Sequence, residues 1–249
     1  MRLRVSWKEW VAILVLLGVG VAILLPSLAR SRESTRRSSC ANNLKQMGLV
    51  CKMFANEHNG YFPPLSPIPG NWVVDANRLY PEYFSDLSIL ICPDSPFGGE
   101  DTFRLRNNFE HPDANPGDWS PDCVSSLFYT YTGYSLLSDE EAYALYEAYE
   151  QGNPEFYQLA DINAQVPVWP DSGRIQGFGT EGIPIMWDRI PPTDAEFSHP
   201  PMGANVLHHN GSVQFVRYSP YNTSNNFPVT RLTGLTFGSS IPTLSADCY

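Results

Sequence analysis

The sequence predicts an α+β protein in which a long N-terminal transmembrane helix packs on a head with a small antiparallel β-sheet. Three observations predict this fold. Residues 10–29 form an uncharged apolar segment, and the polar segment that follows keeps one apolar stripe at helical spacing. Residues 60–249 hold 21 of the 22 prolines and 15 of the 18 glycines, which favours short elements joined by turns. We therefore divide the chain into a helix, residues 1–59, and a globular α+β head, residues 60–249.

The apolar segment WVAILVLLGVGVAILLPSLA is long enough to cross a bilayer. Its 20 residues span roughly 30 Å as a helix, which matches the hydrocarbon thickness. Glu9 lies at its N-terminal edge, where an unpaired carboxylate is costly in lipid and needs a cationic partner or an interfacial position. Gly18 and Gly20 lie in the middle, and Pro26 lacks the amide hydrogen that the helix requires. We expect the helix to bend or loosen between Gly18 and Pro26.

A secretory signal peptide is the alternative interpretation of this segment. Basic residues precede it, and the small residues Ser27 and Ala29 resemble those before a signal-peptidase cleavage site. The apolar core of a signal peptide usually has only about 7–15 residues, so the length of this segment favours an anchor.

The helix is expected to continue past the apolar segment, from Trp7 to His58 overall. Its second half has one apolar stripe whose members recur at steps of three and four, namely Leu44, Met47, Cys51, Phe54 and Ala55. Asn59 and Gly60 form the stop signal, and two prolines prevent the helix from resuming. We expect this half to pack under the head.

Charge divides sharply between the two parts. Residues 1–59 hold nine Lys and Arg against three acidic residues, a net of +6, and residues 60–249 hold seven Arg against 23 acidic residues, a net of −16. The basic part suits anionic lipid headgroups, and the acidic head is a poor partner for nucleic acid. The last lysine is Lys52, so the head has no lysine for Schiff-base or phosphate-loop chemistry. No hydrolase or nucleotide-binding motif is present in the sequence, and we expect no enzymatic activity.

The head shows five elements by pattern. Residue type and periodicity predict strands at 87–92, 127–134 and 183–188, a helix from Ser138 to Gly152, and a hairpin over 204–218. Ser138 and Glu141 fit a capping box at the start of that helix. Asn210 and Gly211 are the preferred pair for a two-residue type I′ turn in the hairpin.

Metal sites find little support in the sequence. The five cysteines lack zinc-ligand spacing, and adjacent histidines such as His208 and His209 point to opposite faces of a strand. Calcium fits the acidic head better, with Asp94 and Asp188 as candidate ligands, but no EF-hand spacing is present. No cofactor and no complete ligand set are assigned. In an exported domain the cysteines favour one or two disulfides, and the odd count leaves one cysteine over.

The N-terminus resembles that of type IV pilins and type II secretion pseudopilins. That family has a carboxylate immediately before an apolar helix and a proline 17 residues later, as Glu9 and Pro26 are here. The resemblance implies that Glu9 neutralises the N-terminal amine of a neighbouring subunit and that the segment from Gly18 to Pro26 melts during assembly. The sequence departs from the family at Arg4, where the family has the glycine after which its peptidase cuts.

Two further motifs are similar to a bacterial pilin-like group with a poorly characterised head. Cys40 begins a Cys-x-x-Asn-Leu-Lys-Gln motif that precedes the exit GYFPP at 60–64. That group also carries a histidine, nine residues and then Asp-Gly, and this chain has His199, ten residues and then Asn210-Gly211. In the same group a Cys-Pro element follows, as at Cys92 here. We favour a disulfide between Cys40 and Cys92, which joins the helix to the head, although the sequence alone leaves the pairing open.

The resemblance implies a structural function. The chain is expected to be a pilin-like or pseudopilin-like subunit of a type II secretion or type IV pilus-like assembly, with other pilin-like subunits and secretion-assembly proteins as partners. Such a protein crosses the cell inner membrane once and places its head in the periplasm or on the cell surface. The alternative is a membrane-anchored binding module that stands alone and does not polymerise, which Arg4 favours.

Overall fold

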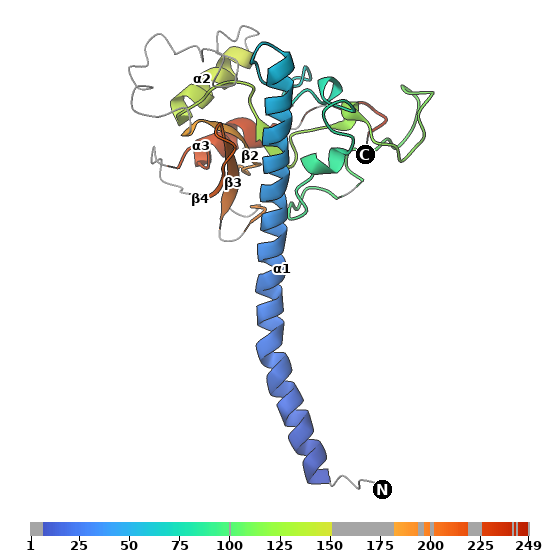
Figure 1. The fold of residues 1–249 in the computed structure, drawn as a ribbon, viewed down its shortest axis with the longest axis vertical. Helices are drawn as coiled ribbons and strands as arrows, with labels where there is room; N and C mark the ends of the chain where they lie inside the picture. The colour runs from blue at the N-terminus through green and yellow to red at the C-terminus, as the bar shows by residue number, and fades with distance from the viewer. Residues whose placement is uncertain are drawn as a thin grey trace.

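The computed structural model describes residues 7–99, 101–150, 182–193, 197–199, 202–218, 226–240, 242 and 244–248. A single helix, α1 (Trp7–Glu57), runs from the N-terminal end of the described chain into the head. Its N-terminal part extends far beyond the head, and its C-terminal part lies among the other elements (Figure 1). The helix ends one residue before the predicted His58, so the predicted long helix is confirmed.

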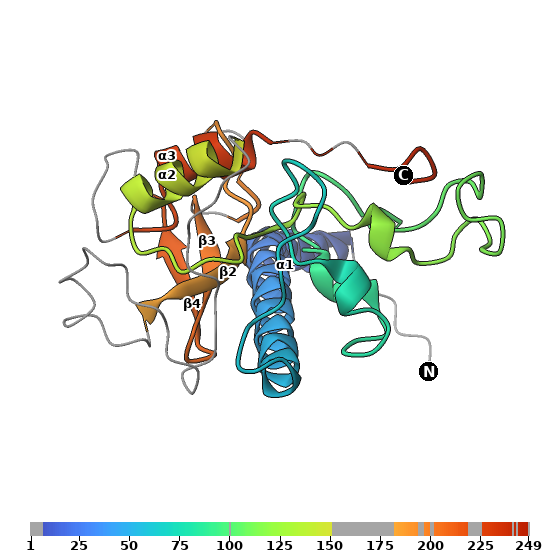
Figure 2. The ribbon, with the colours of Figure 1, turned by 90° about the horizontal axis from the view of Figure 1, so that it is seen from above.

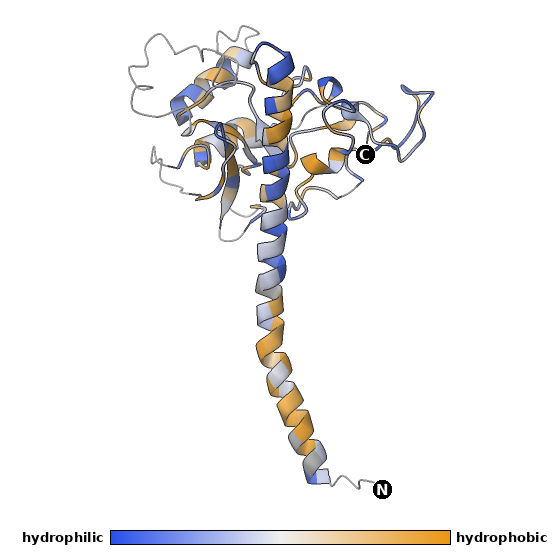
Figure 3. Cartoon of the chain, in the orientation of Figure 1, coloured by the Kyte–Doolittle hydropathy of each residue, from blue (hydrophilic) through white to orange (hydrophobic). Residues whose placement is uncertain are grey.

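The N-terminal part of α1 has apolar side chains that the described residues of the head leave exposed. Trp7, Leu14, Leu16 and Ile23 are each more than 60% exposed. Figure 3 shows this part as a continuous apolar stretch below the more polar part of the helix. By length and composition, α1 includes one candidate membrane span, and none of the apolar window is buried. A surface of this kind is costly in water and requires lipid or other helices around it.

The helix is continuous through Gly18, Gly20 and Pro26. A side chain added at either glycine would meet no atom within 4 Å, so nothing in the described part of the chain packs against the helix there. The exposed part of the helix curves away from the axis of the rest (Figure 1). Bending at a proline is expected because its ring clashes with the preceding turn. Local melting during assembly stays a prediction.

The C-terminal part of α1 forms the centre of the core. The predicted stripe is buried, with Cys40, Leu44, Met47 and Cys51 fully enclosed. The amide of Gly60 donates to the carbonyl of Ala55 at 2.8 Å, which closes the helix with a Schellman-type bond.

The sheet has four antiparallel strands in the order β1-β2-β3-β4: β1 (Tyr129–Tyr131), β2 (Pro184–Asp188), β3 (Gly203–His208) and β4 (Val213–Arg217). The predicted strand at 183–188 and the predicted hairpin are confirmed, and the first strand is shorter than predicted. Helix α1 packs along β3. Gly48 allows this approach, because a Cβ there would lie 3.1 Å from Leu207.

Short helices flank the sheet on the side away from α1 (Figure 2). These are α2 (Asp139–Glu150), α3 (Arg231–Thr233) and the π-helical turn η5 (Gly234–Gly238), which enclose a second apolar cluster around Trp72 and Trp187. Ser138 accepts a hydrogen bond from the amide of Glu141, and the Glu141 carboxylate accepts one from Leu137 rather than from Ser138. The second hydrogen bond of the capping box therefore comes from the amide of Leu137, one residue before the expected donor. The predicted stop at Gly152 lies outside the described residues.

Two local predictions were wrong. Residues 87–90 form a 3-10 helix, η2 (Leu87–Leu90), and not a strand, because the Asp86 carboxylate accepts a bond from the Ser88 amide and caps a helical turn. The hairpin loop has three residues instead of two, since β3 continues to His208 and the His208 amide donates to Ser212. Within this described loop only Gly211 has a positive φ, 81°, which is the arrangement of a type I turn with a G1 bulge.

The remaining short elements lie beside the C-terminal part of α1. They are the 3-10 turns η1 (Ala76–Arg78) and η3 (Pro121–Cys123), which contact each other. With η2 they form the lobe on the opposite side of α1 from the sheet (Figure 1). The C-terminal part of α1 is thus enclosed by the sheet on one side and by loops with 3-10 turns on the other.

Candidate functional site

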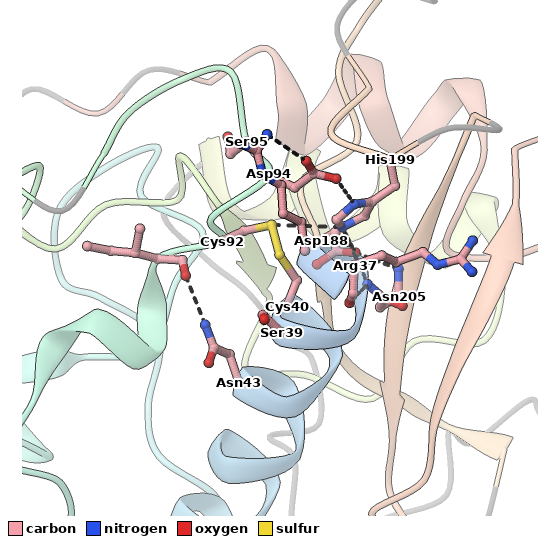
Figure 4. The surroundings of a disulfide bond; sticks show 12 residues. Arg37, Ser39, Cys40, Asn43, Cys92, Asp94, Ser95, Asp188, His199 and Asn205 are labelled. Atoms are coloured by element: carbon pink, nitrogen blue, oxygen red, sulfur yellow. Dashed lines mark hydrogen bonds and ion pairs between the residues drawn. A yellow bond between two sulfur atoms is a disulfide. The ribbon is translucent and has the colours of Figure 1, made fainter. Parts of the chain in front are cut away.

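Polar and reactive side chains converge where α1 enters the head. Cys40, on α1, and Cys92, just after η2, form a disulfide with their Cα atoms 5.0 Å apart. Both cysteines are buried. Nearby, the side-chain amide of Asn43 donates to the Ile91 carbonyl at 2.9 Å. The junction shown in Figure 4 therefore holds the helix to the loop by one covalent bond and one hydrogen bond.

His199 lies against this disulfide with both ring nitrogens engaged. Its Nδ1 is 2.8 Å from Asp94 Oδ2, and its Nε2 is 3.0 Å from Asp188 Oδ2. The same Nε2 is 3.8 Å from the sulfur of Cys92 (Figure 4). The His199 side chain has no exposed surface, and those of Asp94 and Asp188 are 9% and 1% exposed. One imidazole thus bridges two buried carboxylates that are far apart in the sequence.

The sheet positions Asp188 and its partner Asn205. Asp188 ends β2 one residue beyond the pair Trp187–Val206, which places it beside Asn205 on β3. The backbone amide of Asn205 donates to Asp188 Oδ2 at 2.6 Å, and its side-chain amide donates at 2.8 Å. The other carboxylate oxygen, Oδ1, is buried without a hydrogen-bond partner among the described residues. Three donors on one oxygen fix the orientation of this carboxylate.

The environment raises the pKa of His199. Burial has the largest single effect and lowers the pKa, but the hydrogen bonds and charges of Asp188 and Asp94 together outweigh it. The imidazolium form is favoured, since it donates one N–H to each carboxylate. Arg36 adds a second positive charge 3.7 Å from Asp94 Oδ1. Two cations therefore balance the two carboxylates.

A second basic residue of α1 also contacts the sheet. The guanidinium of Arg37 lies 4.7 Å from the centre of the Phe215 ring, in a cation–π contact with β4. Its backbone carbonyl lies 3.5 Å from the side-chain nitrogen of Asn205. The basic segment that follows the apolar part of α1 therefore contacts the head through both Arg36 and Arg37.

The structure separates the residues of the histidine motif. His199 pairs with Gly203 at the start of β3, whereas Asn210 and Gly211 lie in the loop after its end. At about 3.4 Å per residue, the six residues of β3 hold the two parts roughly 20 Å apart. The side chain of Asn210 accepts a bond from the Ser212 amide at 2.8 Å, so it acts within the turn. The histidine and the Asn-Gly pair do not share one site.

Asp94 and Asp188, the candidate calcium ligands, do lie in one cluster, but the arrangement does not fit calcium. A calcium site needs six to eight oxygen ligands around the ion. Here the ring of His199 lies between the two carboxylates and binds one oxygen of each. His208 and His209, which the sequence did not favour as joint metal ligands, are not in this cluster, and the pKa of His208 is lowered by burial.

The head has a second cluster of the same composition, which sequence reasoning missed. Cys123 and Cys248 form a disulfide, and the carboxylates that precede them, Asp122 and Asp247, both lie against His111. Nε2 of His111 is 2.9 Å from Asp122 Oδ2, and Nδ1 is 3.4 Å from Asp247 Oδ2. The Asp-Cys pairs at 122–123 and 247–248 were the available signal.

At this second cluster, too, carboxylate partners raise the pKa of the histidine. The hydrogen bond to Asp122 is the main cause of the raised pKa of His111. Burial acts to raise the pKa of Asp247, but hydrogen bonds from the Glu110 and Phe109 amides and from His111 lower it overall. The C-terminal segment is thereby attached to the loop around residue 110 by a disulfide and an ionic contact.

Cys51 is the cysteine left over. It is buried in α1, and burial is the main cause that raises the pKa of its thiol to about 12. A thiol in this environment is unreactive, because the thiolate is the nucleophilic form.

The residues predicted for assembly lie far from this junction. Glu9 is in the first turns of α1, and Gly18, Gly20 and Pro26 follow in its exposed part. The structure therefore separates two regions along one helix, an apolar N-terminal part and a disulfide-linked junction with the head.

Comparison with curated proteins and with solved structures gave no match. One family model, SBP_bac_10, matches residues 29–75. These residues cover the part of α1 that enters the head, the Cys40 motif and the GYFPP exit. The long apolar helix and the small antiparallel sheet are consistent with a pilin-like architecture. Over residues 29–75 the chain is similar to a family described as a protein of unknown function (DUF1559).

Proposed function

We propose that this chain is a pilin-like or pseudopilin-like structural subunit, anchored in the membrane, of a type II secretion or type IV pilus-like assembly. One observation carries the proposal. The apolar N-terminal part of α1 is exposed, yet it is continuous with the part that forms the centre of the core. A rigid helix of this kind transmits any packing of its apolar part to the position of the head.

The partners follow from the same helix. Its exposed apolar part packs in the bilayer and, during assembly, against the helices of other pilin-like subunits. Glu9 is the assembly residue, because a carboxylate at the edge of the span needs a positive partner such as the N-terminal amine of a neighbour. Secretion-assembly proteins are the remaining partners, and the net charge of −16 over residues 60–249 makes the head a poor partner for nucleic acid.

The disulfides support an extracytoplasmic head. Disulfides persist in oxidising compartments and are rare in the cytosol. Two disulfides join the described part of the chain, one of them between helix and head. We place the protein in the cell inner membrane as a single-pass protein, with its head in the periplasm or on the cell surface.

A structural function without catalysis agrees with the burial of the reactive groups. His199 is fully buried, and the carboxylates that bind it are at most 9% exposed. A general acid or base must reach its substrate within hydrogen-bond distance. The burial of this cluster supports a role in stabilising the junction between α1 and the head.

A membrane-anchored binding module that stands alone is the second candidate. Arg4 favours it, because the family has a processing glycine at this position. The intact mass of the membrane-extracted chain separates the candidates. A chain that begins at Val5 has been processed like a pilin, one that begins at Met1 is an unprocessed anchor, and one that begins after Ala29 is a secreted domain.

Substitution of the assembly residue tests the proposal. Glu9→Ala should abolish co-purification with other pilin-like subunits from native membranes, whereas Glu33→Ala, on the same helix beyond the apolar segment, should leave it unchanged. The amount of chain in the membrane fraction serves as the control for insertion. Unchanged co-purification of Glu9→Ala would remove the assembly function.

A further inference from the structure

The junction between α1 and the head has the donor set of a zinc site as well as a disulfide. The sulfurs of Cys40 and Cys92 and a ring nitrogen of His199 lie within 4.8 Å of one another, and all three residues are buried. Asp188 Oδ2 is 3.0 Å from the same Nε2. We propose that the dithiol form of this junction binds one zinc ion through Cys40, Cys92, His199 and Asp188, and that the disulfide replaces the ion on oxidation.

The distances at His199 match a tetrahedral zinc ion. With zinc bonds of about 2.0–2.2 Å to nitrogen or oxygen and about 2.3 Å to sulfur, a tetrahedron places nitrogen and oxygen ligands about 3.4 Å apart and nitrogen and sulfur about 3.6 Å apart. Here Nε2 is 3.0 Å from Asp188 Oδ2 and 3.8 Å from the Cys92 sulfur. The two sulfurs must separate to about 3.8 Å once their bond is broken, and Nε2 and Oδ2 must move apart by about 0.4 Å.

The surroundings already contain the outer contacts that zinc ligands need. Metal-binding histidines almost always donate their other N–H to a carboxylate, which fixes the tautomer. Nδ1 of His199 has this contact with Asp94 at 2.8 Å, and it leaves Nε2 directed to Cys92 and Asp188. Asn205 holds the Asp188 carboxylate by two hydrogen bonds. No ligand side chain other than the cysteines needs a new orientation.

An unpartnered atom gives independent support for a cation at this place. Asp188 Oδ1 is buried without a hydrogen-bond partner among the described residues, although the side chain is only 1% exposed. A buried carboxylate oxygen without a partner is costly, because it has lost its hydration. A zinc ion bound through Oδ2 would replace the imidazolium as the positive partner of this carboxylate, and the lone pairs of Oδ1 remain available to the same ion.

Zinc binding and oxidation of the junction each conserve protons and electrons. Zinc binding to the dithiol releases the two thiol protons, together with the proton on Nε2 of the imidazolium. On oxidation, the two thiolates give two electrons to a protein disulfide that acts as oxidant, which takes up two protons from water and becomes a dithiol, while Nε2 of His199 takes up one proton again. One sulfur–sulfur bond forms between Cys40 and Cys92, and the zinc ion leaves. Every chain begins as the dithiol, so zinc binding couples to folding of the head before oxidation.

The experiment measures zinc in the full chain, purified in detergent and reduced with a phosphine under anaerobic conditions. After equilibration with zinc chloride and gel filtration, the reduced chain should hold one zinc ion and the oxidised chain none. Cobalt in place of zinc should give thiolate-to-cobalt charge-transfer absorption. His199→Ala should weaken zinc binding at least about tenfold, and Asp94→Asn, which changes only an outer contact, about tenfold or more.

Matched variants keep the test decisive. His111→Ala changes the histidine beside the other disulfide, and Cys123→Ser/Cys248→Ser removes that disulfide, so both should keep one zinc ion per chain. Should His199→Ala fail to fold, His199→Cys should still bind zinc, because a thiolate can replace the imidazole as ligand. Equal zinc content in the reduced and oxidised chains, or unchanged affinity in His199→Ala, would overturn the proposal.

Discussion

The imidazole of His199 lies 3.0 Å from the carboxylate of Asp188, and both side chains are buried at the place where the helix meets the sheet. This contact links β2 to the segment before β3, and Asp94 links the same ring to the loop after Cys92. Three segments that are distant in the sequence therefore meet at one histidine. The stability of the head should depend on it more than on any exposed histidine.

His199→Ala should lower the free energy of unfolding of the head by about 3–5 kcal/mol, because it leaves buried carboxylates without their cation. Chemical denaturation of the full chain in detergent, followed by the fluorescence of the buried Trp72 and Trp187, measures the change. His58→Ala, at an exposed histidine on the same protein, serves as the control and should cost less than about 1 kcal/mol. A loss below 1 kcal/mol for His199→Ala would show that the buried ionic contact contributes little.

The same contact predicts a pH dependence. The pKa of His199 is raised in the folded chain above its unfolded value of about 6.5. Its contribution to stability should be complete below about pH 6.5 and lost as pH rises through the raised folded pKa, since the folded state then holds the proton that the unfolded state has released. Between pH 6 and 9, the difference in the free energy of unfolding between wild type and His199→Gln should become smaller as the pH rises.

His111 needs to be separated from this effect, because its pKa is raised too. The pH series is therefore repeated in a His111→Asn background. The compared chains are His111→Asn and the double variant His111→Asn/His199→Gln. A difference in their free energies of unfolding that stays constant from pH 6 to 9 would contradict the assigned direction of the pKa shift.

Each disulfide should contribute several kcal/mol. The Cys40–Cys92 and Cys123–Cys248 bonds close 52 and 125 residues, for which chain entropy gives about 4 and about 5 kcal/mol. The double serine variants should lower the free energy of unfolding by amounts of this order. The two should differ in proteolysis: loss of Cys40–Cys92 exposes the junction of helix and head, and loss of Cys123–Cys248 exposes the segment around residue 110. Identical cleavage patterns in limited proteolysis would contradict this division.

Asn210→Asp, which restores the residue of the pilin-like group, should change stability by no more than about 0.5 kcal/mol. Aspartate keeps the oxygen that accepts the bond from the Ser212 amide, and the position is exposed. Gly211→Ala is the contrast at the next residue and should cost 1 kcal/mol or more, because its φ of 81° is unfavourable for a residue with a side chain. A large loss for Asn210→Asp would indicate a contact of this side chain outside the turn.

The long helix and the hairpin were predictable because their signals are local. The apolar stripe from Leu44 to Ala55 repeats with the helical period, and no tertiary contact has to be known to read it. The error at 87–90 has a local cause as well. Apolar residues of β type follow Asp86, and the cap that this carboxylate makes with Ser88 outweighs their preference for a strand.

The histidine clusters were beyond such reasoning because they depend on long-range contacts. His199 and Asp94 are separated by 105 residues, and His111 and Asp247 by 136. The two aspartates considered as calcium ligands lie in one cluster, but nothing in their spacing indicates that an imidazole lies between them. Long-range tertiary contacts, and not spacing in the sequence, decide which charges meet at these sites.

The central claim, that the exposed apolar part of α1 packs against other subunits, is tested most directly by site-specific photocrosslinking in native membranes. In one variant a photoreactive amino acid replaces Leu16, which is 72% exposed. In a second variant of the same protein it replaces Phe109, which is 81% exposed on the head. The account predicts that position 16 crosslinks to the N-terminal helix of another pilin-like subunit, identified by mass spectrometry. Crosslinks from position 16 to lipid alone, in membranes that contain the assembled machinery, would contradict it.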